Sequence, residues 1–518
     1  MTEYRQARWV GGPDVLEPTV FELSHGSGFY RFDIEKEVVD FLGVEDPVDL
    51  LPRYLVRSEL RLPSLSEPEV ARHFSRLAQM NYGVDSGPYW LGSCTMKYNP
   101  KIANRVTSWP TVRRIHPYQP EETVQGALRV MYELCCMLAE ITGLPHFTLQ
   151  PAAGAHGELL GALIIRAYHA DRGERRDEML IPVSAHGSNF ASAAMAGFKV
   201  VKIPADSRGR VDMDALKAAV GERTAGMMIT NPNTLGLFED RIAEIVEVVH
   251  SAGGLIYYDG ANLNAIIGRV LLSDMGVDVA HLNLHKTFST PHGTGGPGAG
   301  AVGVRDGLQD FLPVPVIRER DGRFYLDYSV PKTIGRIRTF YGNFEVLVKA
   351  WLYLKVLGSE GLRAVSGAAV LNSNYALSKL KKLRGVEPAF SQPGPFKHEF
   401  VLSLDGIRKE AGVRALDVAK RLLDFGVHPP TIYFPLIVPE AFMMEPTETE
   451  SLRDLDVYIE AMSQAVREAY ENPEILREAP HSTSVGRLDE VLANRRPILS
   501  WRMYERRKKE AGDSDGDL

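Results

Sequence analysis

The sequence has few cysteines and no long apolar run. Its 518 residues include three cysteines, Cys94, Cys135 and Cys136, two of which are adjacent. So sparse and odd a set excludes a disulfide framework and favours a reducing compartment. No apolar run approaches the ~18–20 residues that span a bilayer, and the first residues lack the apolar core of a signal peptide. We therefore expect a cytoplasmic protein without a membrane anchor.

Excess positive charge is absent as well. The formal net charge is −7, which gives no electrostatic reason to expect binding to nucleic acid or to an anionic membrane. Hydrophobic residues make up 44% of the chain and charged residues 24%, as in ordinary globular proteins. A chain of this length has room for two or more domains with large cores.

Between residues 150 and 304, short apolar segments alternate with helical ones. The predicted strands are 179–182, 198–203, 226–230, 255–259, 279–282 and 300–304, and the predicted helices are 158–170, 212–220 and 239–252. This alternation is typical of an α/β fold, a mostly parallel sheet with helices on both faces. Ligands of such sheets bind at the carboxyl ends of the strands.

The rest of the chain flanks this sheet. A helix over 120–143 opens the sheet domain, and a helix over 344–357 bridges it to a second unit with strands near 399–404 and 426–428. Residues 89–100 form either a surface loop or part of a site. The four predicted regions are an irregular N-terminal arm (1–115), a large cofactor-binding domain (116–345), a smaller C-terminal α+β domain (346–500) and a disordered tail (501–518).

One predicted strand runs into a lysine that has no acidic neighbour in sequence. Lys286 follows the strand at 279–282, and the strand at 255–259 ends in Asp259. Desolvation in a pocket activates a lysine used as an amine nucleophile. An amine for an aldehyde and a carboxylate for a ring nitrogen, at neighbouring strand ends, indicate pyridoxal 5'-phosphate (PLP).

Other strand ends carry further candidates for binding this cofactor. The small-residue turn Ala153-Gly154-Ala155 precedes a helix, whose first N–H groups would bind a phosphate. His186 would stack on the cofactor ring, with a locally bonded turn histidine as the alternative. Asn231, Asn233 or Thr234 would bond the phenolic oxygen, and we favour Thr234, although Asn-Pro-Asn is also an ordinary turn signal.

Two other patterns do not indicate a nucleotide or a metal site. Residues 293–298 match GxGxxG, but Pro297 and the strand after it exclude the helix that a dinucleotide motif requires. These glycines would instead let the backbone approach a phosphate. His281, His285 and His292 fall in a strand and a loop, where their spacing does not suit a shared ion. We predict no metal.

These segments together resemble the glycine cleavage system P-protein, the decarboxylating glycine dehydrogenase. The chain length is that of the lysine-bearing second subunit of the two-subunit form, which pairs with a lysine-less first subunit. His156 departs from the glutamine of the single-chain form, so the role of this position stays open. The matching strings are Leu91-Gly-Ser-Cys94-Thr-Met-Lys97, His116-Pro-Tyr-Gln-Pro, Gln150-Pro-Ala-Ala153-Gly-Ala, Ser184-Ala-His186-Gly, Tyr258-Asp259-Gly-Ala-Asn262, Leu282-Asn-Leu-His-Lys286-Thr-Phe, Pro291-His-Gly and Gly295-Gly-Pro-Gly.

The resemblance implies a PLP-dependent transferase of fold type I with a seven-stranded type of sheet. It implies that Lys286 binds PLP, that Asp259 keeps the ring nitrogen protonated and that His186 holds the ring. It implies decarboxylation of glycine and transfer of the aminomethyl group to the lipoyl arm of H-protein, in a system with T-protein and L-protein. The remaining implied cofactor contacts are Ala153, Gly154, Ala155, Thr234, Asn262, His285, Gly295 and Gly296.

Two alternatives stay open at this point. One is another PLP enzyme of the same fold, an aminotransferase or an amino-acid decarboxylase. The other is a non-catalytic scaffold subunit, against which Lys286 and Asp259 argue because a scaffold needs neither. The irregular N-terminal arm favours wrapping around a partner, in a heterodimer or a heterotetramer. Cys94, Thr95 and Lys97, or the partner subunit, would line the channel for the lipoyl arm.

Overall fold

The computed structural model describes residues 17–25, 35–44, 47–57, 62–116, 119–292, 298–341 and 343–510. The chain divides into two compact units. The first is built from residues 83–478, and the second lies within residues 5–82 and 479–518. Among the described residues, no helix is both long and apolar enough to cross a membrane. The four predicted regions stay a prediction.

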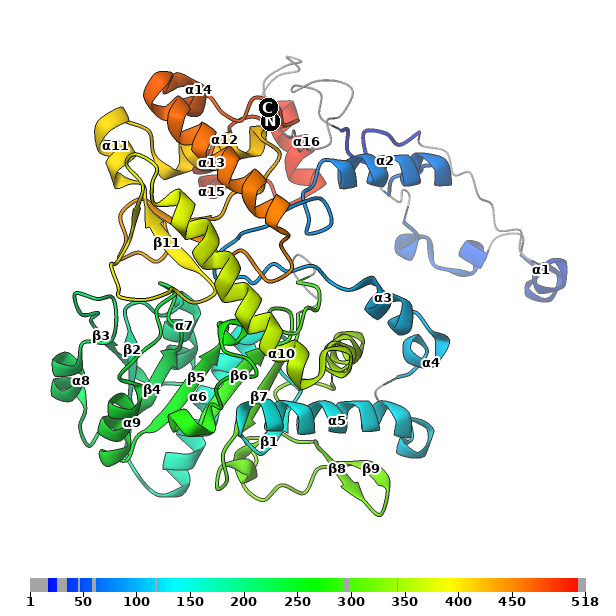
Figure 1. Ribbon diagram of the computed structural model, residues 1–518. Helices are drawn as coiled ribbons and strands as arrows, with labels where there is room; N and C mark the ends of the chain where they lie inside the picture. Colours follow the sequence, from blue (N-terminus) through cyan, green and yellow to red (C-terminus); the bar gives the residue numbers. More distant parts are fainter. Residues whose placement is uncertain are drawn as a thin grey trace. The chain divides into compact units, whose positions relative to one another are not determined.

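A seven-stranded sheet forms the centre of the first unit (Figure 1). Its spatial order is β1 (His146–Thr148), β7 (Gly300–Val304), β6 (Val279–Asn283), β5 (Leu255–Gly260), β4 (Thr224–Thr230), β2 (Glu178–Pro182) and β3 (Lys199–Ile203). Only β7 runs against the others, because it pairs antiparallel with both β6 and β1. The predicted, mostly parallel α/β sheet is therefore confirmed.

Helices cover both faces of this sheet, and adjacent residues of one strand serve opposite faces. Tyr258 packs with the core of α5, α8 and α9, whereas Tyr257 packs with the core of α6 and α7. Strands buried on both sides carry uninterrupted apolar runs, as β4 and β5 do. The helices are α5 (Gln125–Thr142), α6 (Gly154–Asp171), α7 (Gly187–Met195), α8 (Met213–Ala219) and α9 (Ile242–Ser251).

A second, four-stranded antiparallel sheet forms the smaller α+β part of the first unit. Its order is β10 (Glu387–Pro388), β11 (Phe400–Ser403), β13 (Ala441–Met444) and β12 (Thr431–Ile432). The strand predicted at 426–428 is wrong: only His428 forms an isolated bridge, and the prolines at 429 and 430 cannot donate to a ladder. The helices of this part are α11 (Asp405–Ala411), α12 (Ala415–Asp424), α13 (Leu452–Glu471) and α14 (Glu474–Arg477).

A long helix, α10 (Phe344–Leu380), joins the two cores (Figure 1). Its first half packs in the core of the large sheet and its last turns pack in the core of the small sheet. The sequence predicted only the first half, 344–357. The helix is kinked directly after that range, at Gly358, which adopts φ 59°. The remaining elements of the first unit are α3 (Lys101–Thr107), α4 (Pro110–Arg113), β8 (Val316–Arg320) and β9 (Arg323–Asp327).

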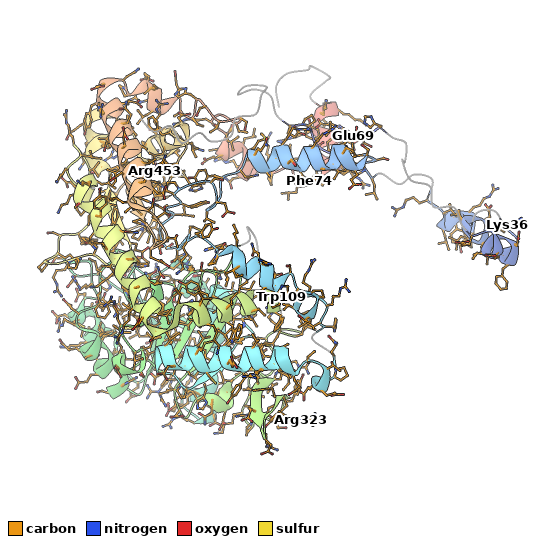
Figure 2. All side chains as sticks on the ribbon, turned by 45° about the vertical axis from the view of Figure 1, so that its right-hand side comes forward. Lys36, Glu69, Phe74, Trp109, Arg323 and Arg453 are labelled. Carbon is orange, nitrogen blue, oxygen red and sulfur yellow. The ribbon has the colours of Figure 1, made fainter. Side chains whose placement is uncertain are left out.

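The second unit joins the two ends of the chain. Its helices are α1 (Lys36–Leu42), α2 (Glu67–Gln79), α15 (Glu490–Arg495) and α16 (Trp501–Glu510). Ser66 and Glu69 form the capping box that starts α2; Glu69 is labelled in Figure 2. Of the tail predicted to be disordered, residues 501–510 are helical, and the ring of Trp501 stacks on Phe21 at 4.9 Å between centroids. Residues 511–518 of this tail lie outside the described residues.

Candidate active site

The carboxyl ends of the parallel strands bring the predicted site residues to one edge of the large sheet. Asp259 is the second-last residue of β5, and Lys286 follows β6, the neighbouring strand. His186 follows β2 and Thr234 follows β4 at the same edge. This is the edge at which parallel α/β sheets bind ligands.

The carboxylate of Asp259 is buried and well supplied with donors. Asn189 Nδ2 donates to Oδ2 at 2.8 Å, the Ala261 N–H donates to Oδ1 at 2.9 Å, and His281 Nε2 lies 3.4 Å from Oδ1. Burial opposes the charge, but His281, these hydrogen bonds and the Lys286 ammonium together hold the pKa of Asp259 below its usual value. Asp259 is therefore ionised at neutral pH.

A second buried acid, Glu158 of α6, lies beside Asp259 and was not predicted. It accepts from Ser188 Oγ at 2.8 Å and from Ser192 Oγ at 3.4 Å. Burial, and then the charge of Asp259, raise the pKa of Glu158 to about 8. Glu158 thus carries a proton at neutral pH and leaves Asp259 as the charged partner. The sequence signal was an acid that opens the apolar stretch 159–165.

The amine of Lys286 meets a backbone oxygen rather than an acid. Lys286 Nζ donates to the carbonyl oxygen of Ser93 at 2.8 Å. Among the described residues, no carboxylate forms an ion pair with this lysine. The turn that carries it is closed by the Lys286 N–H, which donates to the Asn283 carbonyl oxygen at 3.2 Å. The amine is therefore free of a salt bridge and available for covalent chemistry.

The predicted phosphate turn is the first turn of α6, which begins at Gly154 rather than at residue 158. A Cβ on Gly154 would lie 2.1 Å from Asn283 Nδ2, so any larger residue there would have to displace the buried Asn283 amide. Ala153, the residue before the helix, offers no side-chain cap, and this leaves the positive helix end open to an anion. His156 Nδ1 accepts from the Ala152 N–H at 3.1 Å, which gives position 156 a structural task.

Two predicted cofactor residues are bonded to protein groups. Thr234 Oγ1 donates to the Ser184 carbonyl oxygen at 2.5 Å. Asn262 Nδ2 donates at 2.9 Å to the Pro232 carbonyl oxygen and to Glu399 Oε1. Each of these residues therefore supports the edge of the site, and their contact with a cofactor stays a prediction.

The predicted histidines lie at the margin of the site. His186 caps α7, with Nδ1 2.6 Å from Ser188 Oγ, and its exposed ring meets Phe434 edge-on at 5.6 Å between centroids. His285 Nδ1 lies 3.1 Å from the Ala299 carbonyl oxygen, and burial first, then His292, lowers the pKa of His285 to about 3. The ring of His285 is therefore neutral. Gly295 and Gly296 lie outside the described residues.

The loop at 89–100 is part of the site rather than a free surface loop. Thr95 and Lys97 are buried. Lys97 Nζ is bonded to Glu448 Oε1 at 2.7 Å, to Asn264 Oδ1 at 2.9 Å and to the Tyr353 hydroxyl at 3.0 Å. Lys97 is thus committed to the protein, and its predicted place along a lipoyl channel stays a prediction.

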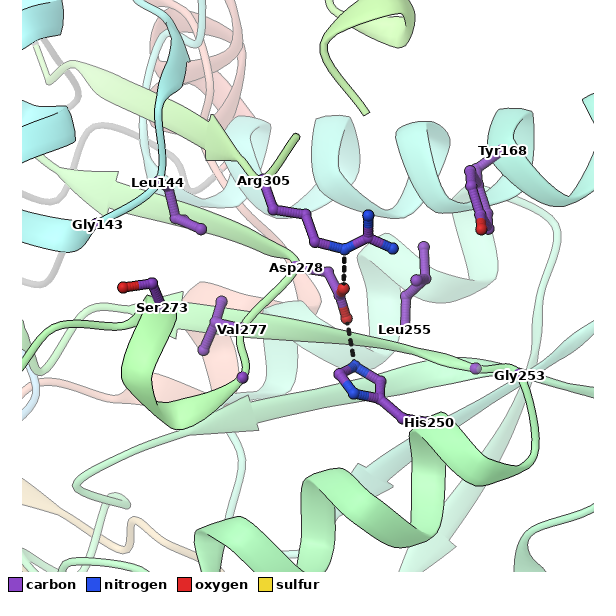
Figure 3. Close-up of a pocket in the computed structure, with 12 residues that line it drawn as sticks. Gly143, Leu144, Tyr168, His250, Gly253, Leu255, Ser273, Val277, Asp278 and Arg305 are labelled. Carbon is purple, nitrogen blue, oxygen red and sulfur yellow. Dashed lines mark hydrogen bonds and ion pairs between the residues drawn. The ribbon is translucent and has the colours of Figure 1, made fainter. Parts of the chain in front are cut away.

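A hollow of about 420 Å³ lies at the opposite edge of the sheet (Figure 3). Asp278, which precedes β6, is buried there between His250 and Arg305. Its Oδ2 accepts from the Ile256 N–H at 2.7 Å and lies 2.8 Å from His250 Nε2, and its Oδ1 accepts from Arg305 Nε. These polar groups bond to one another and tie α9, β5, β6 and β7 together, so this hollow has a structural role.

Comparisons with known proteins agree with this geometry. Residues 365–481 match the family model described as glycine dehydrogenase, C-terminal domain, and residues 160–314 match aminotransferase class-V. The chain is 58% identical over 517 residues to a probable glycine dehydrogenase (decarboxylating) subunit 2 of Pyrococcus furiosus and 59% identical over 515 residues to that of Pyrococcus abyssi. Both alignments cover 99% of this chain and 100% of the relative.

Solved structures share the fold. A crystal structure of glycine decarboxylase (P-protein) of the glycine cleavage system, in inhibitor-bound form, matches with a TM-score of 0.70 at 23% identity. The match covers 85% of this chain and 99% of that chain. A NifS-like protein matches with a TM-score of 0.57 at 16% identity and covers 74% of this chain and 99% of its own. The predicted fold class is confirmed by these matches together with the sheet order.

Proposed function

We propose that this chain, which belongs to the family of the glycine dehydrogenase (decarboxylating) subunit 2, is the PLP-binding subunit that decarboxylates glycine. The observation that carries the proposal is the amine of Lys286 and the ionised Asp259 at the ends of β6 and β5, beside the uncapped N-terminus of α6. PLP supplies an electron sink for the electron pair that remains when an amino acid loses its carboxylate.

The residues present fit PLP. Lys286 offers an amine without a salt bridge, Asp259 offers a buried negative charge, and α6 offers N–H groups for a phosphate. Several buried polar atoms near them have no hydrogen-bond partner among the residues that the structure describes, namely Asn189 Oδ1, Thr287 Oγ1, Thr290 Oγ1 and His292 Nε2. Buried polar atoms of native proteins are normally hydrogen-bonded, so a ligand is their expected partner.

Each residue has one task in this proposal. Lys286, whose amine has no salt bridge, would hold the cofactor through its aldehyde until glycine binds. Asp259, which is ionised at neutral pH, would pair with the ring nitrogen and keep that nitrogen protonated. The protonated Glu158 adds no second charge beside Asp259. The first turn of α6 would bind the phosphate, and His186, at the margin of the site, would cover the ring.

The aminomethyl group that remains would pass to the lipoyl arm of H-protein, and the chain would act with a first subunit. The family name, subunit 2, implies such a partner. Apolar side chains of the second unit support a docked partner, since Phe41 of α1 is 88% exposed and Phe74 of α2, labelled in Figure 2, is 56% exposed. A heterotetramer, the link to T-protein and L-protein and a cytoplasmic location belong to the same proposal.

The experiment is a visible absorption spectrum of the chain co-purified with subunit 1 and PLP. Lys286→Ala should abolish the band of the lysine-bound cofactor, and Lys199→Ala, at an exposed lysine that starts β3, should keep it. With lipoylated H-protein, the wild type should exchange labelled bicarbonate into the carboxyl group of glycine. A band without exchange would favour another PLP enzyme of this fold. Loss of all PLP on dialysis would favour a scaffold subunit.

A further inference from the structure

We propose that Glu399 and Glu445 are positioning residues for Lys286. They hold the turn Ser93–Thr95 so that the Ser93 carbonyl oxygen receives the Lys286 amine whenever this amine is not bonded to the cofactor. The inference rests on the proposed function, because it assigns a place to the amine that glycine displaces. It gives the small antiparallel sheet a direct part in the site.

The small sheet places these two acids side by side. Glu399 directly precedes β11 and Glu445 directly follows β13. Because Phe400 pairs with Met444 in the antiparallel ladder, the two acids leave the same end of the sheet together. Both side chains are buried.

The turn that they hold is unfavourable by itself. Ser93 has φ 62° and Thr95 has φ 48°, the left-handed region that residues with a Cβ seldom occupy. The preceding Gly92 lies so close to the small sheet that a Cβ there would be 2.5 Å from the Met443 carbonyl oxygen. Such a conformation persists only where the surroundings hold it.

The two carboxyl groups supply that hold. The Ser93 N–H donates to Glu399 Oε2 at 2.9 Å. The Thr95 N–H donates to Glu445 Oε2 at 2.8 Å, and Thr95 Oγ1 donates to Glu445 Oε1 at 2.5 Å. With the Ser93 N–H turned toward the acids, its carbonyl oxygen faces the amine of Lys286 at 2.8 Å.

Glu399 also connects the turn to the loop after Asp259. Its Oε1 accepts from Asn262 Nδ2 at 2.9 Å, three residues beyond the acid that faces the ring nitrogen. One carboxyl group therefore fixes the Lys286 acceptor relative to the end of β5. The amide of Asn262 is thus part of the site because it holds Glu399, and its N–H groups already donate to protein atoms.

The charge balance also favours a role beyond packing. Burial, and then the nearby Glu445, raise the pKa of Glu399 well above its usual value, and burial raises the pKa of Glu445 to about 7. His398 does not neutralise the pair, because burial, and then Lys286, lower the pKa of its ring to about 3. Burying two acids side by side near Lys286 costs folding free energy, and packing alone does not require this cost.

The test compares Glu445→Ala with Glu445→Gln, whose amide can still accept from the Thr95 N–H. Hydrogen exchange is measured at Ser93–Thr95 in the cofactor-free chain with subunit 1, and the rate of covalent binding is measured by absorbance after PLP is added. Glu445→Ala should speed exchange about tenfold and slow bond formation by about tenfold to a hundredfold. Glu445→Gln should restore both to within about threefold of wild type.

The matched control is Glu239→Ala, since Glu239 is also a buried acid that accepts from a backbone N–H, that of Val211, away from Lys286. It should change neither quantity. Thr95→Ala, which removes one of the three bonds, should give a smaller effect and serves if Glu445→Ala does not fold. Unchanged exchange, or faster exchange with unchanged bond formation, would overturn the proposal. A band that survives Lys286→Ala would instead refute the proposed function and leave the exchange result standing.

Discussion

Asp259→Asn separates the binding of the cofactor from the reaction. In the structure, Asp259 accepts from Asn189 Nδ2 and from the Ala261 N–H. An asparagine keeps an acceptor for Ala261, and the amide of Asn189, whose Oδ1 has no partner, can turn to accept from the new side chain. We expect a stability loss of about 1 kcal/mol or less, the net worth of one hydrogen bond.

The asparagine cannot supply the charge. A carboxylate and a protonated ring nitrogen about 4 Å apart attract each other by about 4 kcal/mol at an effective dielectric constant of ~20. Each ~1.4 kcal/mol of lost stabilisation slows a reaction about tenfold. Asp259→Asn should therefore slow decarboxylation about a thousandfold while Lys286 still binds PLP.

The assay is exchange of labelled bicarbonate into glycine, normalised to bound PLP, with thermal unfolding as the control for folding. Asp278→Asn is the matched variant, because Asp278 is a buried acid at the other end of the same strands. It should keep exchange within about twofold of the wild type. If Asp259→Asn holds its full complement of PLP and keeps more than about a tenth of the exchange rate, the electrostatic reasoning is wrong.

Three further substitutions test other parts of the site and fold. Asp278→Ala leaves the buried Ile256 N–H unpaired and the half-exposed His250 and Arg305 without their acid, so we expect a loss of about 1–3 kcal/mol in denaturant unfolding. The pKa of Asp278 is lowered in the folded state, so this difference should be full above pH ~4 and should shrink as pH falls and the wild-type acid protonates. The pKa of Glu158 is raised to about 8, so the wild type should lose stability as pH rises from ~4.5 to ~8. Glu158→Gln should remove this loss, which is on the order of 2–4 kcal/mol. An unchanged pH profile in Glu158→Gln would contradict the raised pKa of Glu158. Gly154→Ala puts a Cβ 2.1 Å from Asn283 Nδ2 and should weaken PLP binding about tenfold in equilibrium titration, with the absorption band restored at saturating PLP.

The sequence predicted β2 to β7 of the large sheet because most of these strands are buried on both faces, but it missed the three-residue β1. Strands such as β4 and β5 contain the apolar runs 225–229 and 255–258, and this pattern is visible without a structure. Lys286 and Asp259 were predictable for a related reason, since each is a charged residue at the end of such a run. In the small sheet the sequence predicted β11, near 399–404, but the other strands, of two to four residues, are too short for their period to be recognised.

The rest of the site depends on contacts between residues far apart in the chain. Glu399 and Glu445 reach Ser93 and Thr95 across 306 and 350 residues. No local spacing carries that information. Likewise Glu158 is one acid in an apolar helix, and only the packing of α6 against β5 and β6 brings it to Asp259. The second unit was missed because its contacts join the two ends of the chain, as Phe21 and Trp501 do.

The central claim is that the amine of Lys286 holds the cofactor. The most direct measurement is borohydride reduction of the PLP-loaded protein, followed by mass spectrometry of its peptides. The account predicts one phosphopyridoxyl group on the peptide that contains Lys286 and none on the peptide that contains Lys97. A label on any other lysine, or an unlabelled Lys286 in protein that has bound PLP, would contradict it.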